Sequence, residues 1–173
     1  RTSLFGEQFS YHIWSPDGSK LLIRQNSQIS GDRWSTIDVN TRQVSRLVEG
    51  LYIHPDWSPD STKIVFFKIV PREEVGELVV VNVADRSESI LADDMEGSGN
   101  YLSVPKWSPD GRRIAYPQGV RPNSRIAIIN SDGTNKLILD FDANEAFWSP
   151  DSSRFVAEGP WSVAHHSWES RIV

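Results

Sequence analysis

The chain has 173 residues, of which 38% are hydrophobic and 24% charged, and it contains no cysteine. This composition is ordinary for a globular domain, and the lack of cysteine excludes disulfides and thiolate metal sites. The formal charge of −5 argues against a nucleic-acid binder, since such a protein needs a basic face for phosphates. No apolar run approaches the length of a membrane-spanning helix.

Short β-strands are predicted along the whole chain. Residues 1–4 form the first, and the others cover 20–23, 36–39, 44–48, 63–67, 78–83, 89–91, 113–116, 125–129, 136–139, 154–157 and 171–173. β-Branched residues dominate these runs, and none sustains a helical period over three turns. The sequence therefore predicts an all-β protein.

A five-residue motif divides the chain into four units. WSPDG begins at Trp14 and Trp107, WSPDS begins at Trp57 and Trp148, and the motifs are 41 to 50 residues apart. Each motif follows a short strand that leads into its tryptophan and precedes a β-rich run. Four short antiparallel strands in a unit of about 40–50 residues are typical of a β-propeller blade.

These motifs, each followed by a basic residue and an apolar β run, resemble the TolB-like (WD40-like) propeller repeat. That repeat also occurs in the propeller domains of prolyl-oligopeptidase-type and tricorn-type peptidases and in oligogalacturonate lyases. The resemblance covers essentially the whole chain. It implies a single propeller over residues 1–173, with repeats at about 5–47, 48–91, 92–139 and 140–173 plus 1–4.

The two ends of the chain match as parts of one blade. Residues 1–4 resemble a fourth strand without the three before it, and the chain stops at Val173 where a third strand ends. We expect residues 1–4 to complete the last blade and close a ring, because closure pairs exposed strand edges. Two alternatives stay open: a four-blade part of a larger propeller, and completion of the blade by a second chain.

The motif residues are expected to serve the fold. Each tryptophan is large enough to fill the gap between neighbouring blades. Proline suits a type I turn, and the aspartate after it can accept backbone N–H groups. Successive blades are separated by roughly 10 Å, too far for one metal ion to be shared by the aspartates, which are Asp17, Asp60, Asp110 and Asp151. Gly18 and Gly111 supply a left-handed residue, whereas Ser61 and Ser152 are expected to strain their turns.

Two sets of residues are candidate binding sites. Just before each tryptophan, where a propeller channel opens, the residues do not repeat and could form a polar pocket of His12, His54, Asp56, Lys106 and Glu145. The alternative is a solvated channel lined by unrelated polar groups. The second set is the loop with Trp161, His165, His166 and Trp168, which suits a protein or sugar contact because aromatic residues are enriched in recognition sites. A metal site there would need a third ligand such as Glu158 or Glu169.

No catalytic motif is present in the sequence: it has no G-x-S-x-G elbow, H-E-x-x-H or P-loop. The resemblance to TolB-type propellers of the bacterial envelope therefore implies a non-catalytic, protein-binding scaffold in the periplasm or outside the cell, without a cofactor or metal. It would act as a monomer or as an oligomer that completes a blade. The alternatives are the propeller domain of a peptidase or lyase, and a carbohydrate-binding propeller using Trp34, Trp161 and Trp168.

Overall fold

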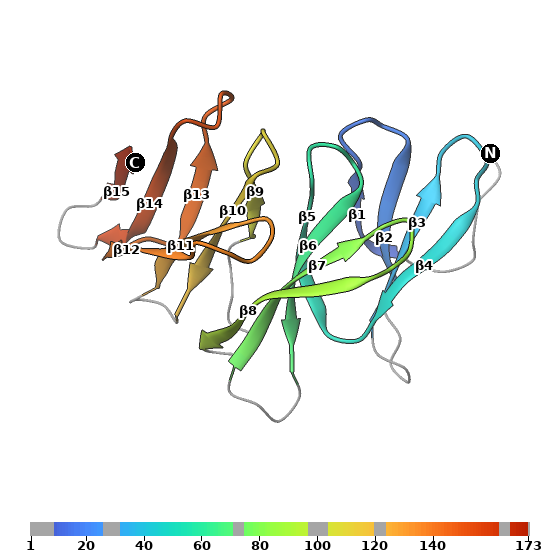
Figure 1. Ribbon diagram of the computed structural model, residues 1–173, viewed down its shortest axis with the longest axis horizontal. Helices are drawn as coiled ribbons and strands as arrows, with labels where there is room; N and C mark the ends of the chain where they lie inside the picture. The colour runs from blue at the N-terminus through green and yellow to red at the C-terminus, as the bar shows by residue number, and fades with distance from the viewer. Residues whose placement is uncertain are drawn as a thin grey trace.

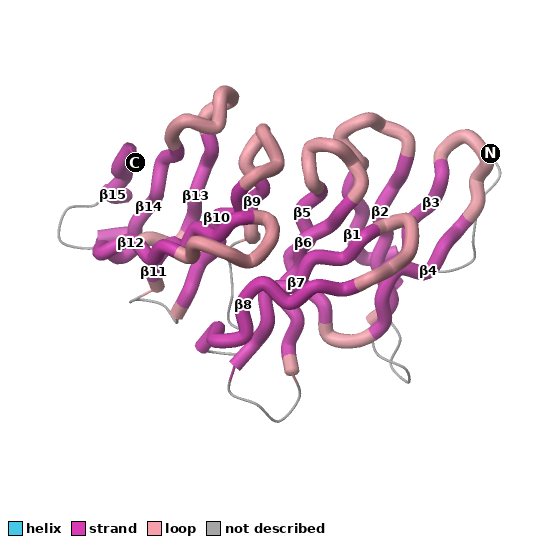
Figure 2. The backbone as a smooth tube through the Cα atoms, in the orientation of Figure 1, coloured by secondary structure: helices cyan, strands magenta, loops and turns pink. Residues whose placement is uncertain are grey.

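A computed structural model describes residues 9–25, 32–70, 75–96, 104–119, 124–162 and 167–172. Every regular element within these ranges is a β-strand, as Figures 1 and 2 show. Among them there is no helix long and apolar enough to cross a membrane. The all-β prediction is confirmed.

The strands form four antiparallel sheets, and within each sheet neighbouring strands follow chain order. The first sheet contains β1 (Phe9–Trp14), β2 (Lys20–Gln25), β3 (Arg33–Asp38) and β4 (Val44–Glu49). The second contains β5 (Tyr52–Trp57), β6 (Lys63–Ile69), β7 (Val75–Asn82) and β8 (Glu88–Glu96). The third contains β9 (Lys106–Trp107), β10 (Arg113–Gln118), β11 (Arg125–Asn130) and β12 (Leu137–Asp142), and the fourth contains β13 (Glu145–Trp148), β14 (Phe155–Ser162) and β15 (Ser167–Ile172).

The sheets stand side by side in an open array. Figure 1 shows the first sheet at one end of the molecule and the fourth at the other, so β1 and β15 lie far apart. Residues 1–4, which we expected to complete the fourth sheet, lie outside the described residues. The described sheets do not close into a ring, and their open arrangement agrees with the alternative of a four-blade part of a larger propeller.

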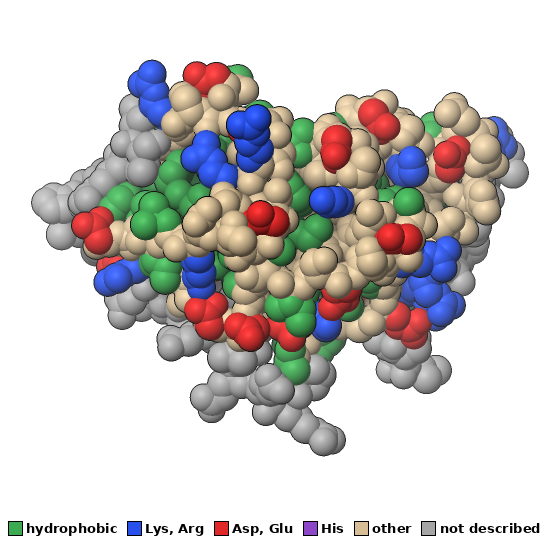
Figure 3. Space-filling model, in the orientation of Figure 1, with side chains coloured by type: hydrophobic (Ala, Val, Ile, Leu, Met, Phe, Trp, Pro, Cys, Tyr) green, Lys and Arg blue, Asp and Glu red, His purple; other side chains and the backbone are tan. Residues whose placement is uncertain are grey.

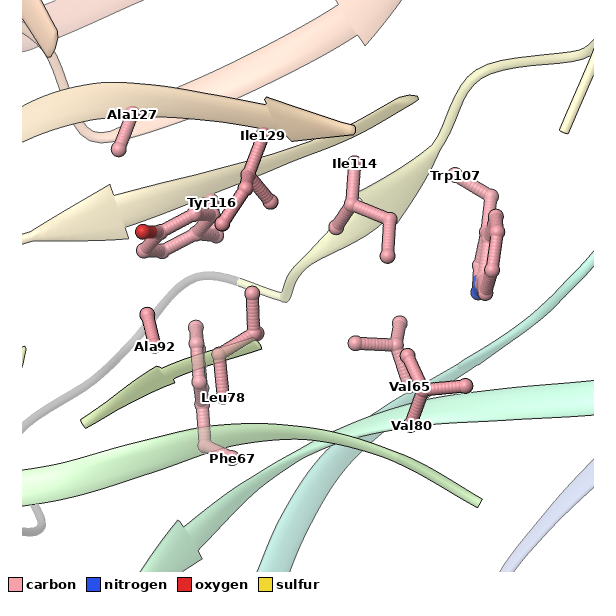
Figure 4. Packing of buried hydrophobic residues seen from close by; sticks show 10 residues of the cluster. All are labelled: Val65, Phe67, Leu78, Val80, Ala92, Trp107, Ile114, Tyr116, Ala127 and Ile129. Atoms are coloured by element: carbon pink, nitrogen blue, oxygen red, sulfur yellow. The ribbon is translucent and has the colours of Figure 1, made fainter. Parts of the chain in front are cut away.

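The hydrophobic core is divided among the three junctions between neighbouring sheets. In β6 the run Ile64–Phe67 is fully buried because alternate side chains enter different junctions: Ile64 and Phe66 face the first sheet, and Val65 and Phe67 face the third. Figure 4 shows the second junction, which contains Val65, Phe67, Leu78, Val80, Ala92, Trp107, Ile114, Tyr116, Ala127 and Ile129. A strand buried on both faces accounts for an apolar run without alternation.

Candidate functional site

The four motif turns share one hydrogen-bond pattern. In the third copy the Ser108 hydroxyl donates to the Asp110 carboxylate at 2.6 Å and accepts the backbone N–H of Arg113 at 2.9 Å. The Asp110 carboxylate also accepts the backbone N–H of Arg112 at 3.1 Å. The same serine-to-aspartate bond, again 2.6 Å long, recurs at Asp17, Asp60 and Asp151. Each motif aspartate is thus engaged within its own turn.

These bonds favour the ionised form of each motif aspartate. The hydroxyl of Ser149, followed by the backbone N–H of Ser153, lowers the pKa of Asp151 to about 2. The Ser15 hydroxyl is likewise the largest cause that lowers the pKa of Asp17. A carboxylate with a pKa this low has no proton to donate at neutral pH and is only a weak proton acceptor, so it makes a poor general acid or base.

The serines that replace glycine in two motifs connect neighbouring sheets. The backbone N–H of Asp17 donates to the Ser61 hydroxyl at 3.1 Å, and that of Asp110 donates to the Ser152 hydroxyl at 2.9 Å. Both serines are buried, and both have positive φ, 61° and 60°. The left-handed backbone that we expected is therefore present, and the hydroxyl supplies a bond between sheets that a glycine cannot form.

The four motif tryptophans differ in exposure. Trp57 and Trp107 are only 5% and 7% exposed, each at the junction with the preceding sheet. Trp148 is half-buried at the third junction, where its Nε1 donates to the carbonyl of Lys106 at 3.1 Å and its ring lies 4.9 Å from the Arg113 guanidinium. Trp14, on the first sheet, is 56% exposed. A motif tryptophan thus packs against the sheet before its own.

The structure brings one pair of the predicted polar-pocket residues together. Asp56 of β5 lies 3.7 Å from the Lys106 ammonium across the second junction, and its other carboxylate oxygen accepts the backbone N–H of Trp107 at 2.9 Å. Burial raises the pKa of Asp56, while the charge of Lys106 and the backbone N–H of Trp107 act in the opposite direction. This pair connects the second and third sheets.

The other predicted polar-pocket residues are distributed over the array. His12 is exposed on the first sheet, opposite Ile23. His54 of β5 packs edge-on against Phe67, with the ring centroids 6.4 Å apart. Glu145 pairs with Glu158 in the fourth sheet. That these residues share a single pocket stays a prediction.

The aromatic loop is only partly within the described structure. Trp161 and Trp168 are backbone partners across β14 and β15, while His165 and His166 lie outside the described residues. Trp34 is 1% exposed, and its Nε1 donates to the Tyr52 carbonyl at 2.9 Å. Trp34 is thus inaccessible to a sugar, which removes it from the carbohydrate hypothesis. Within the described ranges no group of three or more His, Asp or Glu side chains could hold a metal ion.

The fourth sheet carries a pocket of about 620 Å³ that sequence reasoning missed. We call it the fourth-sheet pocket; it is lined by Phe147, Trp148, Ser149, Pro150, Asp151, Arg154, Phe155 and Val156. Phe147 is 48% exposed. Figure 3 shows hydrophobic side chains gathered at this end of the molecule, over β12 and β14. The only signal in the sequence was an aromatic residue before Trp148, where the second and third motifs carry Asp56 and Lys106.

Solved structures of low sequence identity have the same arrangement of strands, although no family model matches the sequence. A protein described as a TolB from Agrobacterium tumefaciens is 18% identical over 94% of this chain, with a TM-score of 0.66. The fold is that of a TolB-like β-propeller. The propeller domain of the Pyrococcus furiosus Trilobed protease, described as having an open velcro topology, is 13% identical over 96% of this chain, with a TM-score of 0.69.

The tricorn protease also contains such a propeller, with a TM-score of 0.69 and 13% identity over 87% of this chain. This chain spans 64% of the Agrobacterium protein, 54% of the Pyrococcus domain and 15% of the tricorn protease. Identities this low establish the propeller fold and leave the activity open, because propellers of one fold perform unrelated functions.

Proposed function

We propose that the chain is a non-catalytic propeller that binds a protein through the fourth-sheet pocket. The observation that carries the proposal is the half-exposed ring of Phe147 in a pocket of about 620 Å³. Arg154 and Asp151 line the same pocket. Aromatic and arginine side chains around a partly desolvated centre are typical of protein recognition sites.

The rest of the array supports this role by making the pocket rigid. The third junction buries Phe155 and Ala146 of the fourth sheet against Ile126 and Leu139 of the third. The turn that forms the pocket wall is fixed by the bond from Ser149 to Asp151 and by the bond from Asp110 to Ser152. A preformed pocket loses little conformational entropy when a partner binds.

The likeness to peptidase propellers gives no reason to prefer a peptidase domain. The same fold occurs in the TolB structure and in acylaminoacyl peptidase from Pyrococcus horikoshii, which is 13% identical with a TM-score of 0.66. The choice between a protein-binding propeller and a peptidase domain therefore rests on the fourth-sheet pocket. The wall of this pocket contains Asp151, which is already engaged in hydrogen bonds within its own turn.

The proposal is tested by photo-crosslinking. A photoreactive phenylalanine analogue would replace Phe147, and a matched control would carry it at Leu51, which is 42% exposed and lies between the first two sheets. We expect covalent protein adducts at position 147, resolved by mass, and none above background at position 51. Absence of adducts at position 147 in native extract and in the purified protein alike would refute the proposal.

A further inference from the structure

Two buried polar atoms of β10 have no hydrogen-bond partner in the described structure. One is the hydroxyl oxygen of Tyr116, a residue with no exposed surface, and the other is the side-chain carbonyl oxygen, Oε1, of Gln118. Buried polar side-chain atoms of folded proteins nearly always bond to a protein group or to an ordered water, because burial removes the hydrogen bonds that bulk water supplies. Each of these atoms therefore calls for a partner.

The two atoms face the same junction and have complementary hydrogen-bonding character. Tyr116 and Gln118 are two residues apart on one strand, so their side chains project from the same face of the third sheet. That face is the second junction, because Tyr116 belongs to its core and the Gln118 Nε2 donates to the Asp94 carboxylate of the second sheet at 3.4 Å. The tyrosine offers a hydroxyl hydrogen and the glutamine an acceptor oxygen. One small molecule with both a donor and an acceptor would satisfy them.

An ion pair covers this end of the junction. The Lys136 ammonium donates to both carboxylate oxygens of Asp94, at 2.7 and 2.8 Å, and lies 5.9 Å from the centroid of the Tyr116 ring. The Lys136 side chain is 23% exposed. Figure 4 shows the Tyr116 hydroxyl at the end of the cluster that carries Ala92 and Ala127, whose side chains are small. The hydroxyl is thus enclosed at a polar end of an otherwise apolar junction.

We infer that one water molecule is bound at this end of the second junction, where it accepts from the Tyr116 hydroxyl and donates to the Gln118 Oε1. A neutral ligand suits the site, because a cation would be repelled by the Lys136 ammonium and an anion by the Asp94 carboxylate. Burial, followed by the charge of Asp94, raises the pKa of Tyr116, so the phenol keeps its proton at neutral pH and acts as a donor. Buried waters typically bind polar groups of this kind that have no protein partner.

The first junction has no corresponding need for a water. In the second motif the residues nine and eleven positions after the tryptophan are Phe66 and Lys68, in place of Tyr116 and Gln118. Phenylalanine carries no hydroxyl, and the Lys68 ammonium is bound by the Glu88 carboxylate at 2.6 Å. The water site therefore belongs to the second junction, and it is independent of the fourth-sheet pocket and of the proposed function.

A high-resolution crystal structure of the chain tests the inference. We expect a water peak within hydrogen-bond distance, about 2.7–3.2 Å, of both the Tyr116 hydroxyl oxygen and the Gln118 Oε1. In solution, the ring protons of Tyr116 should show nuclear Overhauser contacts to a long-lived water. A direct bond from the Tyr116 hydroxyl to a protein atom, with no water peak at the site, would overturn the inference.

A matched pair of variants separates this water from other solvent. Tyr116→Phe removes the proposed donor and should abolish the water peak. Tyr52→Phe removes a hydroxyl that already donates to Glu88 at 2.6 Å in the first junction, and it should leave the peak unchanged. Circular dichroism confirms that both variants are folded. A water that keeps its place in Tyr116→Phe, or that is lost equally in both variants, would contradict the assignment.

Discussion

Replacing each motif tryptophan by alanine should cost very different free energies of unfolding, although the motif is nearly identical in all copies. A buried tryptophan removes about 150–250 Å² from water, which at about 25 cal/mol per Å² is worth about 4–6 kcal/mol. Trp107 is 7% exposed, so Trp107→Ala should lose about 3–5 kcal/mol. Trp14 is 56% exposed, so the same substitution should lose about 2 kcal/mol at most.

The measurement is urea unfolding followed by far-UV circular dichroism, because the substitutions change tryptophan fluorescence itself. Equal losses for Trp14→Ala and Trp107→Ala would refute the reasoning, because they would mean that burial between sheets does not determine the contribution of the tryptophan.

Three further substitutions separate the smaller interactions at the junctions. Ser152→Ala should lower the free energy of unfolding by about 1 kcal/mol because it removes the acceptor of the Asp110 N–H. Ser152→Gly should lower it clearly less, because glycine relieves the positive φ of 60°. The midpoints of urea unfolding compare the two variants. Burial raises the pKa of Asp56, so the contribution of this side chain to the free energy of unfolding is lost as pH rises. The variant Asp56→Asn should therefore be at least as stable as the native chain at pH 7. This difference in stability should vanish below the ordinary aspartate pKa of 3.8. Hydrogen bonds lower the pKa of Asp151 to about 2, so its contribution is present at neutral pH and lost below about pH 4, and Asp151→Asn should flatten that acid loss in urea midpoints measured from pH 2 to 5.

The strands could be predicted from sequence because their signal is local. The run Lys63–Phe67 is rich in β-branched and aromatic residues and follows a turn motif, and the structure places β6 at Lys63–Ile69. The four copies of the motif then gave the number of sheets. Local signals could not decide whether the sheets close into a ring. Closure depends on the angle between successive sheets, which no short stretch of sequence determines.

The groups that connect sheets could not be predicted because they join residues distant in sequence. The bond from Asp17 to Ser61 spans 44 residues, and the bond from Asp110 to Ser152 spans 42. From the sequence alone, each serine was simply a poorer choice than glycine at a left-handed position. Asp56 and Lys106 were both selected as polar residues near a channel, yet only the structure shows that they meet across one junction.

The residue before each tryptophan helps to explain why the sheets have a unique order. All the junctions use similar apolar packing, so any sheet could in principle dock on any other. At the second junction the buried Asp56 is satisfied by Lys106 and by the backbone N–H of Trp107. If the second sheet instead packed against the fourth sheet, Phe147 would stand in the place of Lys106. Asp56 would then lose its cation and remain desolvated, at a cost of several kcal/mol. Phe147 carries no such requirement, so an apolar neighbour can pack against it without leaving an unpaired charge.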